Sequence, residues 1–151
     1  VQLAEDLAGS EPLLVSYGDI IIDPANYKAM VQLANLKQHN VSSVNWIEDP
    51  SAGAAVYLSP EGFLEKIVEK PPAGQSTTNW NNAGVYVFQP VIFDYLRGLG
   101  QSARGEYELT EAVRQMVMAG VPVRAHKITG YWRDVGRPED LVAINELLSN
   151  N

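Results

Sequence analysis

The stretch Leu13-Leu14-Val15-Ser16-Tyr17-Gly18-Asp19 decides the fold class, because a short apolar run stops abruptly at a glycine and a carboxylate. Such a run is typical of a buried strand, which we expect over 13–17. Asp23 and Pro24 then fit the start of a helix. The apolar face of this helix is made by Tyr27, Met30, Val31 and Ala34. A strand that leads directly into a helix predicts an α/β protein.

The rest of the chain alternates in the same way. We expect further strands over 41–48, 54–58, 63–70, 83–88 and 121–128, with 54–58 and 63–70 forming a hairpin. We expect helices over 1–8, from 90 past 96, around 112–117 and over 138–148. Residues 71–82 predict the longest loop. This order predicts one α/β domain, 1–151, whose mixed, mostly parallel sheet is flanked by helices and carries an inserted β-hairpin.

Composition and charge exclude several classes of protein. The 151 residues carry 11 Lys and Arg against 18 Asp and Glu, a net charge of −7, which provides no footprint for nucleic acid. The absence of cysteine excludes disulfides and thiolate chemistry, and two histidines argue against a His-rich zinc site. No apolar run is long enough to span a membrane, and no basic leader opens the chain. We therefore expect a cytoplasmic protein with no nucleic-acid or membrane partner.

Four short motifs stand where a predicted element gives way to a loop, the place where α/β proteins bind ligands. They are Tyr17-Gly18-Asp19, Glu69-Lys70-Pro71, Asn82-Ala83-Gly84 and Trp132-Arg133-Asp134-Val135-Gly136. Carboxylates accept hydrogen bonds from sugar hydroxyls, and a lysine is a point charge suited to phosphate. Each motif alone also has a structural interpretation: a turn, a solvated strand end, a strand entry, or a helix start whose acid complements the dipole.

The order of these motifs, together with Arg104-Gly105-Glu106-Tyr107-Glu108-Leu109-Thr110, resembles the sugar-1-phosphate nucleotidylyltransferases, in particular the thymidylyl and uridylyl enzymes of glucose 1-phosphate. The resemblance covers the chain from Leu3 onward. It implies a Rossmann-like nucleotidyltransferase sheet. It also implies transfer of a nucleotidyl group from dTTP or UTP to a sugar 1-phosphate, expected to be glucose 1-phosphate, with release of pyrophosphate.

The resemblance further implies a role for each matching residue. Asp19 and Asp134 would together hold Mg²⁺, an ion that usually takes one or two carboxylates in such sites. Glu69 would accept hydrogen bonds from the sugar, while Lys70 and Arg104 would contact phosphate. The other substrate-binding positions would be Tyr17, Gly18, Gly53, Ala54, Asn82, Ala83, Gly84 and Trp132. A dianionic sugar phosphate is already a nucleophile at pH 7, so no general base is expected.

Several features depart from the family pattern. Gly53-Ala54 stands where the family usually has Tyr-Gly, which leaves the sugar open, and Arg137 replaces a small hydroxyl residue. The family's Gly-rich, Arg-containing triphosphate loop has no counterpart in the chain, and residue 1 is not Met. We therefore expect the N-terminal part of the domain to be missing, either because the chain is a fragment or because it is a natural truncation that cannot bind triphosphate. We expect the chain to be inactive alone.

The sequence leaves two alternatives to an enzyme open. It also does not decide whether the protein self-associates. The family commonly assembles, so a homo-oligomer is compatible with the resemblance. One alternative is a catalytically silent module that binds a sugar nucleotide and regulates a partner. The other is an interaction domain in which aromatic side chains line a protein interface, namely Trp46, Tyr57, Trp80 and Tyr86.

Overall fold

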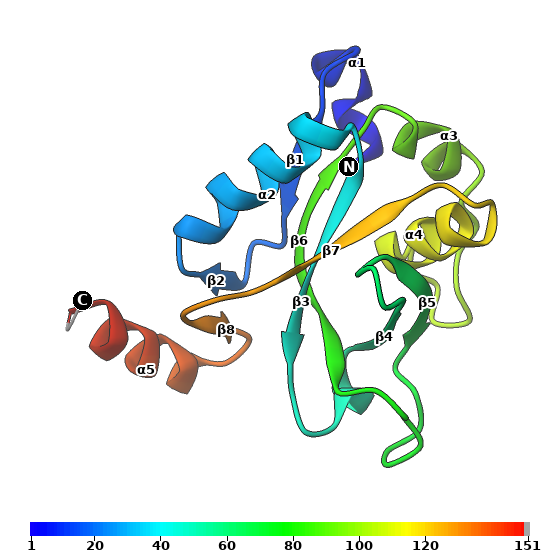
Figure 1. Ribbon diagram of the computed structural model, residues 1–151. Coiled ribbons are helices and arrows are strands. Elements are labelled where there is room, and N and C mark those ends of the chain that lie inside the picture. Colours follow the sequence, from blue (N-terminus) through cyan, green and yellow to red (C-terminus); the bar gives the residue numbers. More distant parts are fainter. Residues whose placement is uncertain (150–151) are drawn as a thin grey trace.

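The computed structural model describes residues 1–149 and shows a twisted central sheet with helices against both of its faces (Figure 1). The helices are α1 (Glu5–Ala8), α2 (Ala25–Lys37), α3 (Ile92–Arg97), α4 (Leu109–Met118) and α5 (Pro138–Ser149), with short 3₁₀ turns η1 (Gln2–Ala4) and η2 (Pro50–Ala52). The strands are β1 (Leu13–Ser16), β2 (Ile20–Ile22), β3 (Asn40–Trp46), β4 (Ala54–Leu58), β5 (Leu64–Glu69), β6 (Trp80–Phe88), β7 (Val123–Lys127) and β8 (Trp132–Asp134).

The predicted mixed sheet with its inserted hairpin is confirmed. The strand order is β5-β4-β6-β3-β7, and β1 pairs with β6 beside β4. Strands β1, β3, β4 and β7 run in one direction, whereas β5 and β6 run in the other. Most strands of the sheet therefore run in one direction, as predicted, but most neighbouring strands pair in an antiparallel manner. Within residues 1–149 only β3 and β7 form a parallel ladder, because the reversed strand β6 lies between β3 and the pair β1 and β4.

The 13–17 run is a strand, but it is not the buried strand that its composition predicts. Among the described residues β1 pairs with β6 alone, with Leu13 opposite Phe88 and Ser16 opposite Val85. Its residues alternate between half-buried and exposed, and Leu14 is 40% exposed. The apolar run therefore predicted a strand correctly. Its burial depends on the position of the strand in the sheet, which the run does not indicate.

Strand β6 begins at Trp80, three residues before the expected start, because Trp80 and Asn81 pair with the end of β3. The register between β3 and β6 then shifts, since Ser42 lies opposite Tyr86 while Val44 lies opposite Asn82. Strand β6 thus bulges around Ala83–Val85, and the Ser43 hydroxyl accepts a hydrogen bond from the Val85 N–H (3.0 Å). Bulges of this kind re-aim side chains and are common beside functional sites.

The sequence did not predict the small two-stranded sheet made by β2 and β8. Ile20 lies opposite Asp134 and Ile22 opposite Trp132, and the Val135 N–H donates to the Asp19 carbonyl (2.8 Å). Three-residue strands are too short to show a periodicity. This ladder nevertheless brings together two segments that are distant in the chain.

Two clusters of buried side chains hold helices to the opposite faces of the sheet. One joins α3 and α4 to the sheet through residues that include Tyr86, Phe88, Ile92, Val113 and Met116. The other joins α2 and β2 to it through Ile20, Ile22, Met30, Ala34, Val41, Val85 and Val87. The face predicted for α2 is therefore the one that packs.

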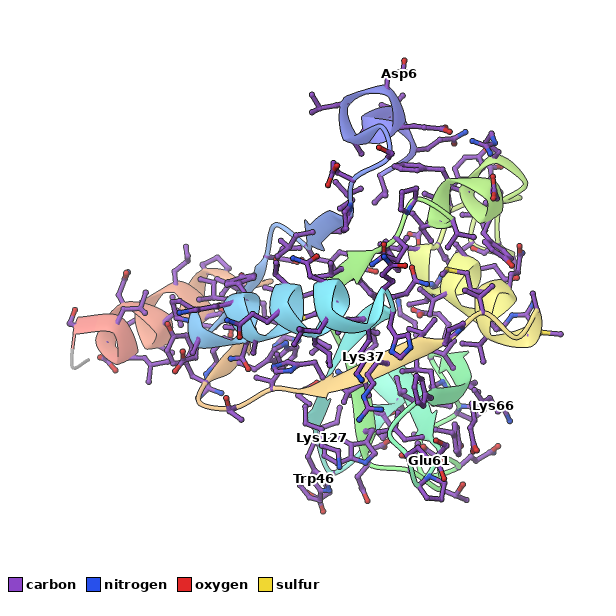
Figure 2. The ribbon with its side chains drawn as sticks, turned by 45° about the horizontal axis from the view of Figure 1, so that its top comes forward. Asp6, Lys37, Trp46, Glu61, Lys66 and Lys127 are labelled. Atoms are coloured by element: carbon purple, nitrogen blue, oxygen red, sulfur yellow. The ribbon has the colours of Figure 1, made fainter. Side chains whose placement is uncertain are left out.

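The aromatic residues considered for a protein interface divide between core and surface. Tyr86 is fully buried, whereas Trp46 is 62% exposed at the end of β3. Trp80 pairs with Trp46 and lies under the Lys127 ammonium, 4.6 Å from the ring centre. Lys127 and Trp46 mark this end of the sheet in Figure 2. No helix among residues 1–149 combines the length and the hydropathy needed to cross a membrane.

Candidate functional site

A cavity of about 650 Å³ lies between the ends of β1, β5 and β8, the start of β4 and the first half of β6. Eleven of the thirteen sequence-predicted site residues line it: Tyr17, Asp19, Gly53, Ala54, Glu69, Lys70, Asn82, Gly84, Arg104, Trp132 and Asp134. Gly18 and Ala83 are not part of the lining. A larger cavity of about 970 Å³, beside Trp46 and α5, contains neither Lys70 nor Arg104. The chemistry-bearing motifs therefore converge on the smaller cavity.

Asp19 and Asp134 share one wall of the cavity because the β2–β8 ladder places Asp134 opposite Ile20. The pKa of Asp134 is raised, first by burial of its carboxyl and then by the negative charges of Asp19 and Asp140. No group of three or more acidic, His or Cys side chains in the described part of the chain could hold a metal ion. Two neighbouring carboxylates whose repulsion a cation would relieve fit Mg²⁺, which fills its remaining positions with phosphate and water.

Glu69 ends β5, and Lys70 follows it in a left-handed conformation with φ of 42°. The Lys70 N–H donates to the Gly53 carbonyl (2.7 Å), which ties this turn to the start of β4. A left-handed conformation at a residue with a side chain is strained, and such strain is common at functional sites. The turn places the carboxylate and the ammonium on the same cavity wall.

The Glu69 carboxylate is fixed by two side chains from the 104–110 segment. The Thr110 hydroxyl donates to Oε2 (2.9 Å), and an Arg104 Nη2 donates to Oε1 (3.4 Å). Thr110 is buried at the start of α4. The sequence pointed to Arg104 and did not single out Thr110, whose role depends on a contact between residues far apart in the chain.

Gly53 and Ala54 are held against Asn81, which is buried in β6. The Ala54 N–H donates to Asn81 Oδ1 (3.2 Å), and the Asn81 amide donates to Asn45 Oδ1 (3.0 Å). A Cβ atom at Gly53 would lie 2.3 Å from Asn81 Oδ1, so the close approach requires glycine. Asn81 belongs to the cavity and was missed because its neighbour Asn82 carried the motif.

The bulge in β6 forms the wall between Tyr17 and Trp132. The Tyr17 N–H donates to the Gly84 carbonyl (3.0 Å), and the Trp132 indole N–H donates to the Ala83 carbonyl (2.9 Å). Ala83 is fully buried, so its backbone supports Trp132 while its side chain faces away from solvent. Gly18, in the turn after β1, lies outside the lining.

Two tyrosines and an asparagine form a hydrogen-bonded chain that runs inward from the cavity. The Asn82 amide lies 2.6 Å from the Tyr86 hydroxyl, and that hydroxyl lies 3.3 Å from the Tyr17 hydroxyl. Burial raises the pKa of Tyr17 and raises that of Tyr86 well above its usual value. Both phenols are therefore neutral at physiological pH, and Tyr17, which lines the cavity, can offer a hydrogen bond to a polar ligand.

Several known proteins are similar to this chain over nearly its whole length. A bifunctional GlmU protein of Methanococcus aeolicus is 33% identical over 142 residues, which cover 94% of this chain and 33% of that protein. A glucose-1-phosphate thymidylyltransferase of Streptomyces griseus is 27% identical, over 98% of this chain and 41% of its own length. The chain thus spans about a third to two fifths of these relatives.

The same fold is found in the crystal structure of a UDP-glucose pyrophosphorylase complexed with UDP-glucose. That structure superposes with a TM-score of 0.86 at 24% identity, over 99% of this chain and 61% of the other. The family model described as nucleotidyl transferase matches residues 1–151. The resemblance drawn from the motifs is thereby confirmed, and the chain belongs to the nucleotidyl transferase family.

Proposed function

We propose that this chain supplies the sugar-phosphate and Mg²⁺ sites for transfer of a nucleotidyl group from dTTP or UTP to glucose 1-phosphate. The observation that carries the proposal is the convergence of Asp19, Asp134 and the Glu69-Lys70 pair on one cavity. Relatives named for glucose-1-phosphate thymidylyl transfer and for UDP-glucose binding support the choice of substrates. The proposal places the protein in the cytoplasm and allows it to form a homo-oligomer.

The residues divide between binding the sugar and neutralising phosphate. Glu69 accepts hydrogen bonds from sugar hydroxyls, and Tyr17 offers a neutral phenol to the same ligand. Lys70 and Arg104 supply positive charge to the phosphate. Trp132, fixed through its indole N–H, gives the sugar a rigid apolar surface. The substrate-binding assignments for Gly18, Gly53, Ala54, Asn82, Ala83 and Gly84 belong to this proposal.

In the proposed reaction a phosphate oxygen of glucose 1-phosphate attacks the α-phosphorus of the nucleoside triphosphate in line. The bond from the α-phosphorus to the bridging oxygen of the β-phosphate breaks, and pyrophosphate leaves with that electron pair. Mg²⁺ held by Asp19 and Asp134 would offset the negative charge of the phosphoryl oxygens. The chain's own contribution is positioning and charge, because the nucleophile needs no proton removed.

The first test replaces Asp134 with Asn and measures binding of glucose 1-phosphate by isothermal titration calorimetry, with and without Mg²⁺. We expect the Mg²⁺-dependent part of the affinity to be lost, because one of two metal-binding carboxylates is gone. The matched control is Asp6→Asn on α1, at the far end of the molecule (Figure 2). Equal Mg²⁺ dependence in Asp134→Asn and in the unaltered chain would contradict the metal assignment.

Asp134→Asn should also change the free energy of unfolding, in a direction that the pKa shift of Asp134 fixes. The pKa of Asp134 is raised in the fold, so its ionisation destabilises the protein above that pKa and has no such effect below the unfolded value of 3.8. Asp134→Asn should therefore raise the free energy of unfolding at pH 7, by at most about 1 kcal/mol because water screens much of the repulsion. Urea unfolding at pH 7 and pH 3.5 measures the gain, which should vanish at the lower pH.

A pyrophosphate-release assay tests whether the chain is active by itself. The chain is incubated with Mg²⁺, glucose 1-phosphate and either dTTP or UTP. Release of pyrophosphate would contradict the expected inactivity and exclude the silent module, whereas ligand binding without release is the result expected of a chain that has no counterpart of the triphosphate loop.

A further inference from the structure

Three carboxylates surround the Arg104 guanidinium. Its Nη2 lies 3.0 Å from Glu108 Oε1 and 3.4 Å from Glu69 Oε1, and its Nε lies 3.6 Å from Glu106 Oε2. All four side chains line the candidate cavity. The three contacts differ in length and in exposure to water, so they are not equivalent.

Of the three carboxylates, Glu108 has the shortest contact with Arg104 and the least exposed side chain. Its side chain is only 14% exposed, whereas that of Glu106 is 65% exposed and its contact is the longest. Ion pairs shielded from water are screened less than exposed ones. Glu108 also lies four residues after Arg104, at the N-cap of α4, where its carbonyl accepts a hydrogen bond from the Glu111 N–H (3.0 Å).

The Glu69 contact, by contrast, conflicts with the proposed function. Glu69 is the carboxylate expected to accept hydrogen bonds from the sugar, and Arg104 is the cation expected to reach the phosphate. In the structure, Arg104 Nη2 and Glu69 Oε1 contact each other at 3.4 Å. A sugar hydroxyl that binds Glu69 Oε1, or a phosphate that binds the same Nη2 hydrogen, must therefore replace this contact.

We propose that Glu108 is a positioning residue for Arg104: it anchors the guanidinium in the cavity while the contact with Glu69 is exchanged for the phosphate of the ligand. This inference rests on the proposed function of the cavity. Thr110 stays bonded to Glu69 during the exchange and keeps that carboxylate turned toward the sugar.

The charge of the cavity lining allows the proposal to be tested by the direction in which the affinity for phosphate changes. Its lining carries five carboxylates and two cations: Asp19, Glu69, Glu106, Glu108 and Asp134 against Lys70 and Arg104. If Glu108 acted only through its charge, its removal would make the cavity less negative and would tighten the binding of a phosphate. If it positions Arg104, its removal weakens that binding.

The experiment is calorimetric titration of glucose 1-phosphate, with Mg²⁺ present, into the unaltered chain, Glu108→Ala and Glu106→Ala. Glu108→Ala should lose about tenfold in affinity, the usual effect of a charged hydrogen bond. Glu106→Ala removes the same charge from an exposed position and should bind at least as tightly as the unaltered chain. Glu108→Gln, which keeps an acceptor atom but loses the charge, should fall between Glu108→Ala and the unaltered chain.

A double variant shows whether Glu108 acts through Arg104. In an Arg104→Met background, Glu108→Ala should cause no further loss, because the group that it positions is absent. Thermal unfolding of each variant verifies that it is folded. An affinity of Glu108→Ala equal to or above that of the unaltered chain would overturn the inference alone. Failure of the unaltered chain to bind glucose 1-phosphate would overturn the proposed function and this inference with it.

Discussion

At the scale of single residues, Lys70 combines a strained backbone with the charge that the site needs. Its φ of 42° lies in the left-handed region that glycine adopts freely. Lys70→Gly should therefore keep the free energy of unfolding within about 1 kcal/mol of the original value, because relief of strain offsets the entropy of a freer unfolded chain. The same variant should bind glucose 1-phosphate more weakly. Urea unfolding and calorimetric titration measure the two effects.

Lys66 is the matched control for this prediction. It is an exposed lysine inside β5, where its backbone is extended and pairs with Tyr57. Lys66→Gly should destabilise the protein by about 1 kcal/mol, because glycine is unfavourable in a strand. Equal destabilisation by the two substitutions would show that the left-handed turn at Lys70 carries no strain.

At the scale of elements, the bulge of β6 decides the shape of the cavity wall. Gly84 has a φ of +79°, and a Cβ atom there would lie 2.9 Å from both Tyr17 Cδ2 and Ile20 Cγ1. Gly84→Ala should destabilise the protein by roughly 1–3 kcal/mol and displace Tyr17 from the wall. Urea unfolding measures the first effect, and weaker binding of glucose 1-phosphate reports the second.

Gly100 is the control for the bulge. A Cβ atom there would meet nothing within 4 Å, and its φ is not left-handed. Gly100→Ala should be neutral or slightly stabilising, by up to about 1 kcal/mol, because alanine restricts the unfolded chain. A Gly84→Ala protein as stable as Gly100→Ala would mean that the bulge relaxes without cost.

At the scale of the whole molecule, His126 and Asn26 tie α2 to β7 and to the segment that leads into β8. Asn26 Oδ1 accepts hydrogen bonds from the Thr129 N–H (3.0 Å) and from His126 Nε2, also at 3.0 Å. Burial lowers the pKa of His126 below its usual value of 6.5. The unfolded chain therefore binds a proton that the folded chain resists, in the range just below pH 6.5.

The pH dependence follows from that shift. The free energy of unfolding should fall as the pH is lowered from about 7 toward 5, because protonation of His126 favours the unfolded chain. His126→Gln removes the titrating group, so the difference between its stability and that of the original should shrink with falling pH. Urea unfolding at pH 7, 6 and 5 measures this difference, and a constant difference would contradict the role of His126.

Local sequence patterns were sufficient for most elements of the fold. The helical spacing of Met30 and Ala34 identified the packed face of α2, and the turn after Leu58 identified the hairpin. The four short motifs and the family resemblance together named eleven residues that line one cavity. The β2–β8 ladder escaped prediction, since three-residue strands show no period and are stable only through their partner.

The sequence by itself determined the α/β alternation and the family, because these depend on periodicity and motif order. Only the tertiary structure decided which groups meet. Asp19 and Asp134 share a wall through a ladder between distant segments, and Glu69 is held by Thr110 and by an arginine that Glu108 anchors. Such contacts join residues far apart in the chain, and they arise from strand pairing and a bulge that no local pattern encodes.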